Sequence, residues 1–385
     1  MSSFCNYFNQ GICASCKRIE EPYPQQLKSK SDTLDRILAE FVELDQLLEK
    51  LSPIPSPTFA FRNKAKFSVT GTLQDPIIGL TGLKDLDQGR DISACVLHQS
   101  EINDLLPKIR TFIQESKLLP YQIKTRSGEL KGMILYYSPE SKQMYLRLVL
   151  RSKEAIARIE KFKKSLLAQC PALVCFSANI QPIPHAILEG NEEIFFTEQR
   201  FIDHQLGEIK MRLHPQGFVQ TNQEVAIQLY STAAKWVQAL GAETFMELFS
   251  GQGAFSFFIQ KFVKRAIGIE INPEAVARAN QTTKENGWEH LSFIAKDASS
   301  VFESAMQFTP DVLLVNPPRK GLGASLTAIQ KIGSPYFIYS SCNAETLAKD
   351  LTQLKDQYCV MKYQLFDMFP HTDHFETLVL LKRLN

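Results

Sequence analysis

Two residues near the end of the chain carry side chains suited to covalent and proton-transfer chemistry. Cys342 follows an apolar run in YSSCN, and Glu376 lies in HTDHFET. A thiolate is a strong nucleophile where local cations or donors lower its pKa, and Arg319 and the helix expected after Asn343 are candidate sources. A carboxylate can accept a proton in a later step. Considered alone, Cys342 is more simply a packing residue and Glu376 a surface carboxylate.

A glycine-containing loop followed by an acidic residue indicates a cofactor site. ELFSGQGAF contains Gly251 and Gly253, which allow a tight turn close to a ligand, and Glu270 ends the next apolar run, where it can bind ribose hydroxyls. NAD and S-adenosylmethionine both fit this pattern. A dinucleotide fingerprint requires a third glycine where this chain has Ser256, and a dehydrogenase has no use for the rigid turn NPPR at 316–319. We therefore favour S-adenosylmethionine.

S-adenosylmethionine and a cysteine nucleophile together suit methylation of carbon 5 of uracil. That carbon is too weak a nucleophile to attack a sulfonium methyl group unless a thiolate first adds to carbon 6, and Cys342 is the predicted nucleophile. The adduct must then lose its carbon 5 proton, for which we predict Glu376 as the general base. His371 and His374 are alternative bases, because imidazole titrates near neutral pH.

Three cysteines near the start of the chain indicate a metal centre. Cys5, Cys13 and Cys16 form C-x7-C-x2-C, and Cys95 is the first later cysteine that can complete four ligands. Four thiolates suit either zinc or an iron–sulfur cluster, and the ligand type does not distinguish them. Apart from the predicted nucleophile, the remaining cysteines are interpreted as core residues, namely Cys170, Cys175 and Cys359. The first two of these are alternatives for the fourth ligand.

The elements that must position the catalytic residues lie in the second half of the chain. From about residue 210, apolar runs alternate with helical stretches, which is typical of an α/β fold with a doubly wound, mostly parallel sheet. The expected strands are 244–249, 265–270, 291–297, 311–318 and 335–342, and the expected helices are 222–240, 255–263, 273–286, 323–332 and 344–356. Residues 360–382 predict a closing antiparallel hairpin on the sheet edge. The predicted site residues follow strand ends, where ligands bind in such sheets.

The first half of the chain is predicted to contain a smaller mixed α/β domain. A helical pattern covers about 31–51, a proline-rich break follows at 52–59, and period-two runs at 61–71 and 144–152 predict strands. We therefore expect three parts, which are a lead segment 1–20, a central domain 21–209 and a catalytic domain 210–385.

Basic side chains alternate along both predicted strands of the central domain, so each row shares one face. The rows are Arg62, Lys64 and Lys66, and Tyr145, Arg147 and Arg151, with Lys124, Arg126 and Lys131 nearby in sequence. Such rows are usually a solvated sheet face, but beside a methyltransferase site they suit RNA phosphates. The target uracil must leave its stack to reach the nucleophile, so loops or bulges are the expected substrates.

Composition sets broad limits. The 385 residues include 44% hydrophobic and 22% charged residues, with a formal net charge of +2, which is ordinary for a globular protein and neither requires nor excludes nucleic acid. The sequence has no apolar run long enough to span a membrane and no secretory signal at the start, so we expect a cytoplasmic protein. In that compartment the eight cysteines are expected to be free, catalytic or metal-bound rather than paired.

Together these motifs resemble the RNA uracil-C5 methyltransferase family over essentially the whole chain. The matching motifs are QTN at 220–222, LFSGQGAF, GIE, NPPRKG, YSSCN and FPHTDHFE. The resemblance implies a Rossmann-like class I methyltransferase domain, preceded by an RNA-binding domain and an iron–sulfur segment, with Cys342 as nucleophile and Glu376 as base. The S-adenosylmethionine contacts that it implies are Gln220, Phe249, Glu270 and Asn316, and the implied ligands of a [4Fe–4S] cluster are Cys5, Cys13, Cys16 and Cys95.

Within the family, the chain looks most like the branch that methylates uracil 747 of 23S rRNA. The tRNA uracil-54 branch lacks the cluster cysteines, and the 23S rRNA uracil-1939 branch carries a TRAM barrel, for which there is no room before Cys5. Ala254 departs from the asparagine of the uracil-1939 branch, so no side-chain contact to the cofactor is expected there. The implied partner is 23S rRNA, with no obligate protein partner.

Two other functions fit parts of the sequence. Methylation of an adenine amino group also uses an NPP turn, but it places an aromatic residue where this chain has Arg319 and needs no thiol. The second alternative is an iron–sulfur RNA-binding or redox-sensing protein with a vestigial methyltransferase fold, which would bind RNA without transferring a methyl group.

Overall fold

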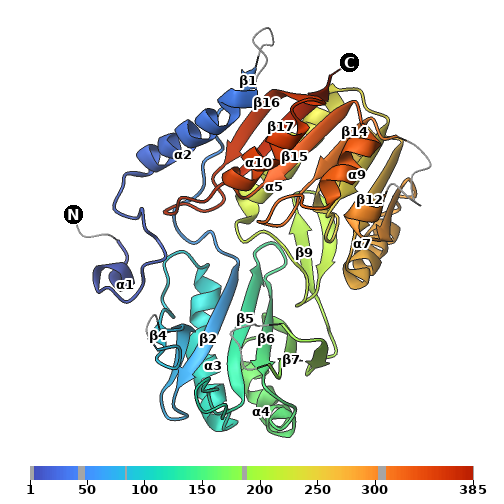
Figure 1. Cartoon of the computed structure of the whole chain (residues 1–385). Helices are drawn as coiled ribbons and strands as arrows, with labels where there is room; N and C mark the ends of the chain where they lie inside the picture. The colour runs from blue at the N-terminus through green and yellow to red at the C-terminus, as the bar shows by residue number, and fades with distance from the viewer. Residues whose placement is uncertain (1–3, 42–47, 83–84, 184–188, 302–308, 385) are drawn as a thin grey trace. The chain divides into compact units, whose positions relative to one another are not determined.

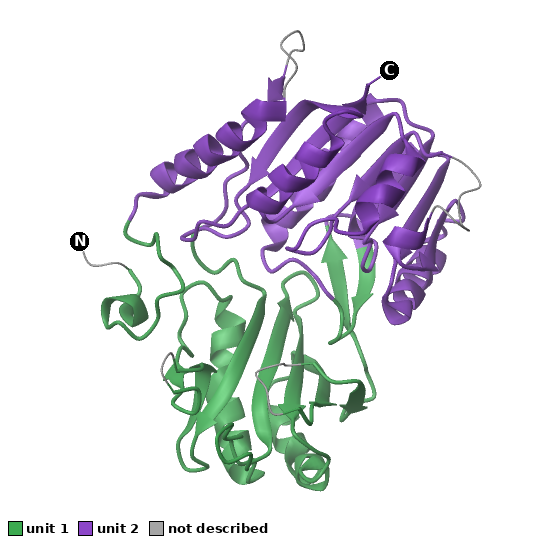
Figure 2. Ribbon diagram, viewed as in Figure 1, with its two compact units in different colours: residues 1–20, 58–206, 210–217 green, residues 21–57, 207–209, 218–385 purple. Residues whose placement is uncertain are grey.

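The structure is a computed structural model that describes residues 4–41, 48–82, 85–183, 189–301 and 309–384. The chain divides into two compact units, which Figure 2 colours separately. Unit 1 comprises Met1–Glu20, Thr58–Leu206 and Lys210–Gly217, and unit 2 comprises Glu21–Pro57, Gly207–Ile209 and Phe218–Asn385.

Unit 2 is built on an eight-stranded, mostly parallel sheet with the order β1-β16-β17-β15-β14-β11-β12-β13 (Figure 1). Five neighbouring strands are parallel to one another, and these are β11 (Thr244–Leu248), β12 (Arg265–Glu270), β13 (Leu291–Ala295), β14 (Val312–Val315) and β15 (Tyr336–Ser341). Most of their apolar residues are buried, because helices cover both faces of a doubly wound sheet. The predicted doubly wound parallel sheet is confirmed.

The expected helices are also present, with ends shifted by a few residues. They are α5 (Gln223–Ala239), α6 (Ala254–Ile259) continued by η2 (Gln260–Phe262), α7 (Pro273–Asn286), α9 (Ser325–Ile332) and α10 (Ala344–Leu354), and a short η3 covers Ala298–Ser300. Asparagine caps three of the helices, since Asn222, Asn272 and Asn343 each accept a hydrogen bond from the first helical turn. Such caps fix where a helix begins after the preceding strand or loop.

The two faces of this sheet pack against different helices. One core joins strand residues such as Met246 and Leu248 to Ile329 of α9 and Leu351 of α10. Because side chains alternate along a strand, Glu247 points to the opposite face. There α5 and α6 pack together, with the rings of Tyr230 and Phe255 4.8 Å apart.

The predicted antiparallel hairpin is present, but it is not the edge of the sheet. β16 (Tyr358–Phe366) and β17 (Glu376–Arg383) pair with each other, and β17 lies between β16 and β15. The two-residue strand β1 (Glu49–Lys50) adds to β16 on its outer side. A segment from the first part of the chain therefore completes the sheet of unit 2.

Residues 21–57, which we expected in the central domain, make their contacts in unit 2. The helix α2 spans Tyr23–Leu38, followed by η1 (Ala39–Phe41), rather than the expected 31–51, and residues 42–47 lie outside the described part of the chain. α2 packs beside the loop that precedes β17. Lys30 Nζ lies 2.7 Å from Asp367 Oδ1 and 3.0 Å from the carbonyl oxygen of Phe369, and both charged side chains are almost fully buried.

Unit 1 contains a seven-stranded sheet with the order β4-β3-β2-β5-β6-β7-β8. Its strands are β2 (Lys64–Gly71), β3 (Pro76–Leu80), β4 (Arg90–Asp91), β5 (Leu130–Ser138), β6 (Gln143–Leu150), β7 (Leu173–Ile180) and β8 (Glu192–Phe195). The helices α3 (Ser100–Glu115) and α4 (Ile156–Gln169) pack on one face through residues such as Phe112 and Leu166. The short helix α1 (Asn6–Asn9) and a two-stranded sheet of β9 (Ile202–Leu206) and β10 (Ile209–Leu213) are separate elements.

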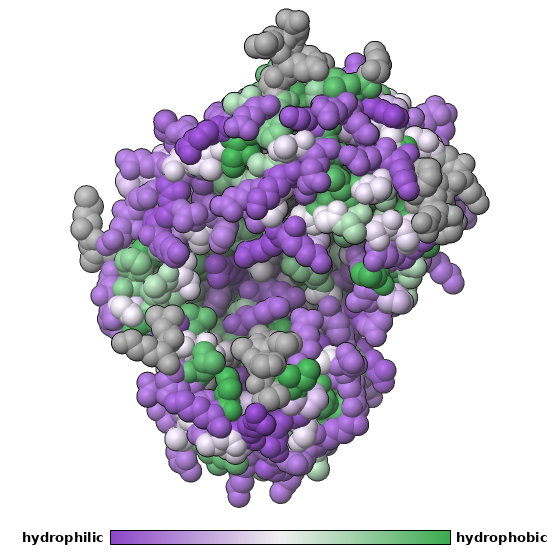
Figure 3. Space-filling view, viewed as in Figure 1, coloured by the Kyte–Doolittle hydropathy of each residue, from purple (hydrophilic) through white to green (hydrophobic). Residues whose placement is uncertain are grey.

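No helix in the described ranges is long and apolar enough to cross a bilayer. On the face shown in Figure 3, hydrophilic side chains predominate and hydrophobic ones are scattered among them. Single exposed hydrophobic residues of this kind are normal on a folded surface.

The buried Lys30–Asp367 pair predicts a large effect on the stability of unit 2. Lys30→Met leaves the Asp367 carboxylate buried without its cation, and we expect the free energy of unfolding to fall by about 3–5 kcal/mol. Both tryptophans of the chain, Trp236 and Trp288, lie in unit 2, so their fluorescence during urea unfolding reports this unit.

The matched control is Lys28→Met on the same helix. Lys28 pairs with Asp32 at 2.9 Å, but both side chains are largely exposed, so little change is expected. Equal losses in the two variants would contradict the importance of the buried pair.

Candidate active site

The loop after β11 has the backbone of a ligand-binding turn. Phe249 has φ +60°, which is rare for a residue with a side chain, and Gly251 and Gly253 have φ +54° and +89°. A Cβ atom at Gly253 would lie 2.4 Å from the ring of Phe293, so only glycine fits there. The predicted glycines are therefore favoured at both positions by the backbone conformation. At Gly253 a side chain would also clash with Phe293.

Glu270 lies beside this loop. β11 and β12 are paired in parallel, and Glu270 Oε2 accepts a hydrogen bond of 2.9 Å from the Gly251 N–H, while Oε1 accepts one of 3.0 Å from the Asn272 N–H. A carboxylate has about four acceptor positions, so capacity remains for ribose hydroxyls. Ser250 Oγ and Gln252 Oε1 are buried with no hydrogen-bond partner in the described part of the protein. These polar atoms fit a polar ligand such as the nucleoside part of S-adenosylmethionine.

The NPPR turn is attached to the same loop region. β14 pairs with β11, and the backbone N–H of Asn316 donates a 3.4 Å hydrogen bond to the carbonyl oxygen of Leu248. Asn316 is partly buried, and Arg319 three residues later is exposed. Three strand ends thus bring Phe249, Glu270 and Asn316 to one edge of the sheet.

Cys342 and Glu376 come together through strand pairing. β15 and β17 are antiparallel with Ser341 opposite Thr377, so the next position of the register places Cys342 opposite Glu376. Cys342 is partly buried, whereas Glu376 is only 3% exposed. The predicted nucleophile and the predicted base are therefore neighbours.

The charges around Cys342 differ from our expectation. Burial raises the pKa of the thiol, the carboxyl of Glu376 raises it further, and Arg319 lowers it through its charge and a hydrogen bond. Arg319 acts as predicted, while Asn343 Oδ1 accepts the N–H groups of Glu345 and Thr346 in the first turn of the following helix. The net pKa lies above the ordinary thiol value.

Glu376 is a buried carboxyl group. Burial raises its pKa to about 8, while a hydrogen bond from Gln220 and the charge of Arg319 act in the opposite direction. Its Oε2 atom is buried with no hydrogen-bond partner in the described part of the chain. A base with a pKa near the working pH, and with one oxygen available, is suited to accept a proton from a bound substrate.

The two histidines considered as alternative bases are placed differently. His371 is buried, its backbone N–H donates a 2.8 Å hydrogen bond to Gln26 Oε1, and its ring Nδ1 lies 3.3 Å from Gln26 Nε2. His374 is exposed and its ring lies edge-on to Phe369. The geometry therefore favours Glu376 over both histidines.

Sequence reasoning missed Glu247 of β11. This residue is 1% exposed, accepts hydrogen bonds from the backbone N–H and the hydroxyl of Ser256 at 3.0 and 2.5 Å, and has its pKa raised to about 8 by burial. It fixes the first turn of α6 against β11. An acidic residue inside an otherwise apolar strand was the available signal.

The cysteines of the predicted cluster lie in unit 1 and interact electrostatically. Burial raises the pKa of Cys16 to about 12, Arg62 lowers it, and Cys95, Cys13 and Cys5 raise it further. Across the residues that the structure describes, no group of three or more His, Cys, Asp or Glu side chains is arranged to hold a metal ion. The four-thiol donor set suits an iron–sulfur cluster, which stays a prediction.

The lead segment is attached beside Cys95. The Tyr7 hydroxyl accepts a 2.9 Å hydrogen bond from the Ala94 N–H, and Arg90 Nη1 donates one of 2.9 Å to the carbonyl oxygen of Ile12.

The three cysteines interpreted as core residues are confirmed as buried, and these are Cys170, Cys175 and Cys359.

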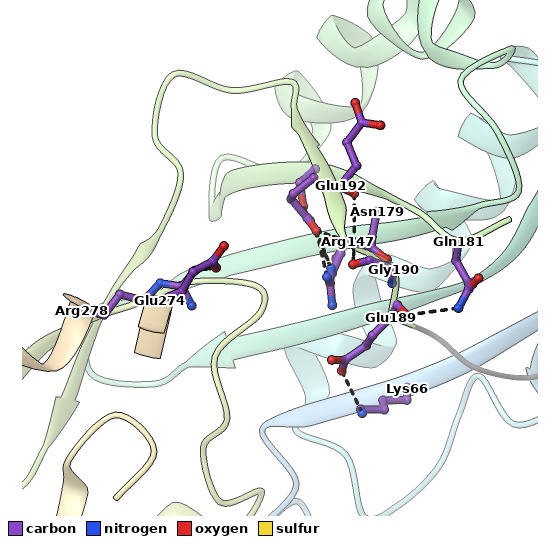
Figure 4. A network of polar contacts seen from close by, with 11 residues as sticks. Lys66, Arg147, Asn179, Gln181, Glu189, Gly190, Glu192, Glu274 and Arg278 are labelled. Atoms are coloured by element: carbon purple, nitrogen blue, oxygen red, sulfur yellow. Dashed lines mark hydrogen bonds and ion pairs between the residues drawn. The ribbon is translucent and has the colours of Figure 1, made fainter. Parts of the chain in front are cut away.

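Only part of the predicted basic rows lies on the unit 1 sheet, because Arg62 precedes β2 and Arg151 follows β6. Several members already have partners within unit 1. Lys66 and Arg147 are in one cross-strand row with Ile134 between them. Arg147 is 1% exposed and donates from Nε and Nη2 to the carboxylate of Glu193, while Lys66 lies 3.7 Å from Glu189 (Figure 4).

Lys131 and Lys124 are also engaged within unit 1. Lys131 is buried and donates to the carbonyl oxygen of Ile183 at 2.5 Å, and Lys124 pairs with Asp85 at 2.5 Å. The side chain of Lys66 is half exposed, and its long ion pair with Glu189 is solvated. Replacing Glu189 by a phosphate as the partner of Lys66 would therefore cost little free energy. Lys66 is therefore better placed for RNA than Arg147 or Lys131.

Comparison with known proteins identifies the family. Residues 187–384 match the family described as tRNA (Uracil-5-)-methyltransferase. The chain is 40% identical to the 23S rRNA (uracil(747)-C(5))-methyltransferase RlmC of Serratia proteamaculans, over 98% of this chain and 99% of that protein. It is 41% identical to the RlmC of Shewanella amazonensis, over 98% and 97%. The chain belongs to the tRNA (uracil-5-)-methyltransferase family. The expectation of an S-adenosylmethionine-dependent uracil-C5 methyltransferase is confirmed.

A solved structure shows the same fold. The crystal structure of Pyrococcus abyssi tRNA (uracil-54, C5)-methyltransferase in complex with S-adenosyl-L-homocysteine superposes with a TM-score of 0.77. The match covers 96% of this chain and 86% of that one at 23% identity. The predicted class I methyltransferase fold is thereby confirmed, while the RNA-binding and iron–sulfur roles of unit 1 stay predictions.

The raised pKa of Glu376 predicts how stability depends on pH. The carboxyl has a pKa of about 8 when folded and an ordinary value of 4.5 otherwise. The stability that it contributes is therefore complete below pH 4.5 and is lost as the pH rises through 8, with a slope approaching about 1.4 kcal/mol per pH unit. Glu376→Gln removes this titration, so tryptophan-monitored urea unfolding should depend less steeply on pH in the variant.

Glu289→Gln is the control, because Glu289 is an exposed carboxylate of the same unit. It should leave the wild-type pH dependence unchanged. Parallel curves for wild type and Glu376→Gln would show that Glu376 titrates at an ordinary pKa.

Proposed function

We propose that this protein methylates carbon 5 of uracil 747 in 23S rRNA, with S-adenosylmethionine as methyl donor. Relatives that are named for this reaction share about 40% of residues over nearly the whole chain. The observation that carries the mechanism is the antiparallel pairing of Ser341 with Thr377, which brings the adjoining Cys342 and Glu376 together, with Arg319 acting on both.

The proposed reaction begins at Cys342. Its Sγ adds as thiolate to carbon 6 of the uracil, and the electron pair of the ring double bond moves toward carbon 5 and the carbonyl at carbon 4. S-adenosylmethionine would supply the methyl group that carbon 5 takes up, and the bond between that methyl group and the sulfonium sulfur would break to release S-adenosylhomocysteine. The positive charge of Arg319 favours the thiolate form of Cys342.

Glu376 completes the reaction. Its carboxylate accepts the proton from carbon 5, the electron pair of that bond re-forms the ring double bond, and the bond between carbon 6 and sulfur breaks. The thiolate of Cys342 is released and the base is 5-methyluracil. Gln220, which hydrogen-bonds Glu376, would orient the carboxyl group.

The proposed S-adenosylmethionine contacts follow the strand ends. Glu270 would accept hydrogen bonds from the ribose, and Phe249 and Asn316 would line the site after β11 and β14. Gln220 would link the cofactor site to the general base, Glu376. The buried, unpartnered polar atoms of Ser250 and Gln252 support the fit of a polar ligand.

The rRNA would be bound through unit 1 as well. We propose that the target uracil lies in a loop or flips out of its stack, since carbon 6 must reach Cys342. The exposed basic residues of unit 1, such as Lys66, would contact phosphates. We further propose that the enzyme works in the cytoplasm and needs no obligate protein partner.

A [4Fe–4S] cluster is proposed for Cys5, Cys13, Cys16 and Cys95. Its role would be structural, because the lead segment carries three of the ligands and Cys95 lies in unit 1 beyond β4. Bonds from four thiolates would add to the hydrogen bonds that fix this segment, such as the one between Tyr7 and Ala94.

Covalent trapping tests the nucleophile. A 23S rRNA fragment in which uracil 747 is replaced by 5-fluorouracil should form a gel-stable complex with the wild-type enzyme and S-adenosylmethionine, because fluorine on carbon 5 cannot leave as a proton. Cys342→Ala should abolish the complex, and the control Cys359→Ala, at a buried position on β16, should retain it. Glu376→Gln should form the complex even with ordinary RNA, since elimination is blocked.

A complex of undiminished yield with Cys342→Ala would disprove the mechanism. No methyl incorporation by the wild type from labelled S-adenosylmethionine into any rRNA fragment would favour the vestigial RNA-binding alternative. Incorporation into an adenine amino group would instead favour an adenine amino-group methyltransferase.

Iron and sulfide content tests the cluster. Wild-type protein purified without oxygen should contain both, and serine at any one of the four cysteines should reduce the content and lower stability. Cys170→Ser, at a buried cysteine of the same unit, should keep the metal. A cluster variant that stays fully folded and loses only turnover would contradict the structural role.

A further inference from the structure

Asp350 of α10 is a buried carboxylate that contacts two separate parts of unit 2. It is 7% exposed, and its Oδ2 atom accepts a 2.9 Å hydrogen bond from the backbone N–H of Leu322 and a 2.6 Å hydrogen bond from the hydroxyl of Tyr339. Leu322 belongs to the loop after NPPR, and Tyr339 belongs to β15, three residues before Cys342. One oxygen atom therefore joins the loop to the strand.

The loop is shaped to approach this carboxylate. Gly321 has φ +80°, and a Cβ atom there would lie 2.6 Å from Asp350 Oδ2. Any other residue would both strain the backbone and push the carboxylate away. A glycine at this position is explained by Asp350.

α10 contacts the loop at a second point. Asn343, which caps the helix with Oδ1, donates from Nδ2 to the carbonyl oxygen of Arg319 at 3.2 Å. The segment from Arg319 to Leu322 is thus fixed at both ends by one helix. The first residue of this segment, Arg319, acts on both Cys342 and Glu376.

We infer that Asp350 is a positioning residue for the methyl transfer, because its carboxylate fixes the loop 319–322 against β15 and so holds the Arg319 guanidinium beside Cys342. This inference rests on the proposed function. The hydrogen bonds are charge-assisted and buried, the condition in which such bonds contribute most to holding a geometry.

Displacing Arg319 and removing the charge of Asp350 would change the pKa of the Cys342 thiol in opposite directions. The titratable and charged groups around Cys342 are Glu376 of β17, Arg319 of the loop and Tyr339 of its own strand. Removing a negative charge at Asp350, with nothing else changed, would lower the pKa of the thiol. Releasing Arg319 from the site would raise it. The sign of the change therefore separates positioning from a direct charge effect.

The test is the pH dependence of iodoacetamide alkylation at Cys342, resolved by peptide mass spectrometry. Asp350→Asn keeps the shape but removes the charge, and we expect alkylation at pH 7 to fall about threefold, the change that a pKa increase of about 0.5 produces. Asp356→Asn, an exposed carboxylate just after α10, is the control and should match wild type. This measurement needs neither RNA nor S-adenosylmethionine, so it is independent of the trapping experiment.

A double-mutant comparison completes the test. Arg319→Gln should reduce alkylation by itself, and adding Asp350→Asn should then have no further effect, because both changes act through the guanidinium. Unchanged or faster alkylation in Asp350→Asn, or an equal fall with and without Arg319, would overturn the inference. If Asp350→Asn does not fold, Tyr339→Phe removes only the hydrogen bond on the strand side and should reduce alkylation in the same direction. No reduction in that variant would also overturn it.

Discussion

The burial of the Glu376 carboxyl group beside the Cys342 thiol is the constraint on which the site depends. Taking either group out of water penalises its charged form, so both pKa values rise. Arg319 is the cation that opposes this rise at both groups. The position of one exposed arginine therefore sets how readily the thiolate and the carboxylate form.

The fold supplies this arrangement through one departure from a purely parallel sheet. β17 runs antiparallel to β15, so the end of one strand meets the start of the other and their terminal residues become neighbours. The loop that leads into β17 is fixed by α2, where Lys30 bonds Asp367 and the carbonyl oxygen of Phe369. A helix from the beginning of the chain thus stabilises the approach to the proposed base.

The sequence was informative where a local pattern decides the structure. Apolar runs predicted the five parallel strands, and the glycine loop and Glu270 were predicted to form one site, where the structure joins Gly251 and Glu270 by a 2.9 Å hydrogen bond. It was not informative where partners are distant, because no local pattern links Lys30 to a residue 337 positions away. For the same reason the net rise in the pKa of Cys342 was missed, since it depends on burial and on a carboxyl group brought in by β17.

The proposed reaction uses the charged forms of Cys342 and Glu376 one after the other. The two groups can therefore be buried side by side without both being charged at once. Two negative charges in one buried place repel each other strongly, and one guanidinium cannot balance both. In the proposed reaction the thiolate of Cys342 becomes a neutral thioether once it has added to the base. The carboxylate of Glu376 is needed only after that step, when the sulfur carries no charge. A site held near Arg319 therefore has to accommodate one negative charge at a time, and the burial that raises the pKa of the Glu376 carboxyl disfavours its charged form while Cys342 is a thiolate.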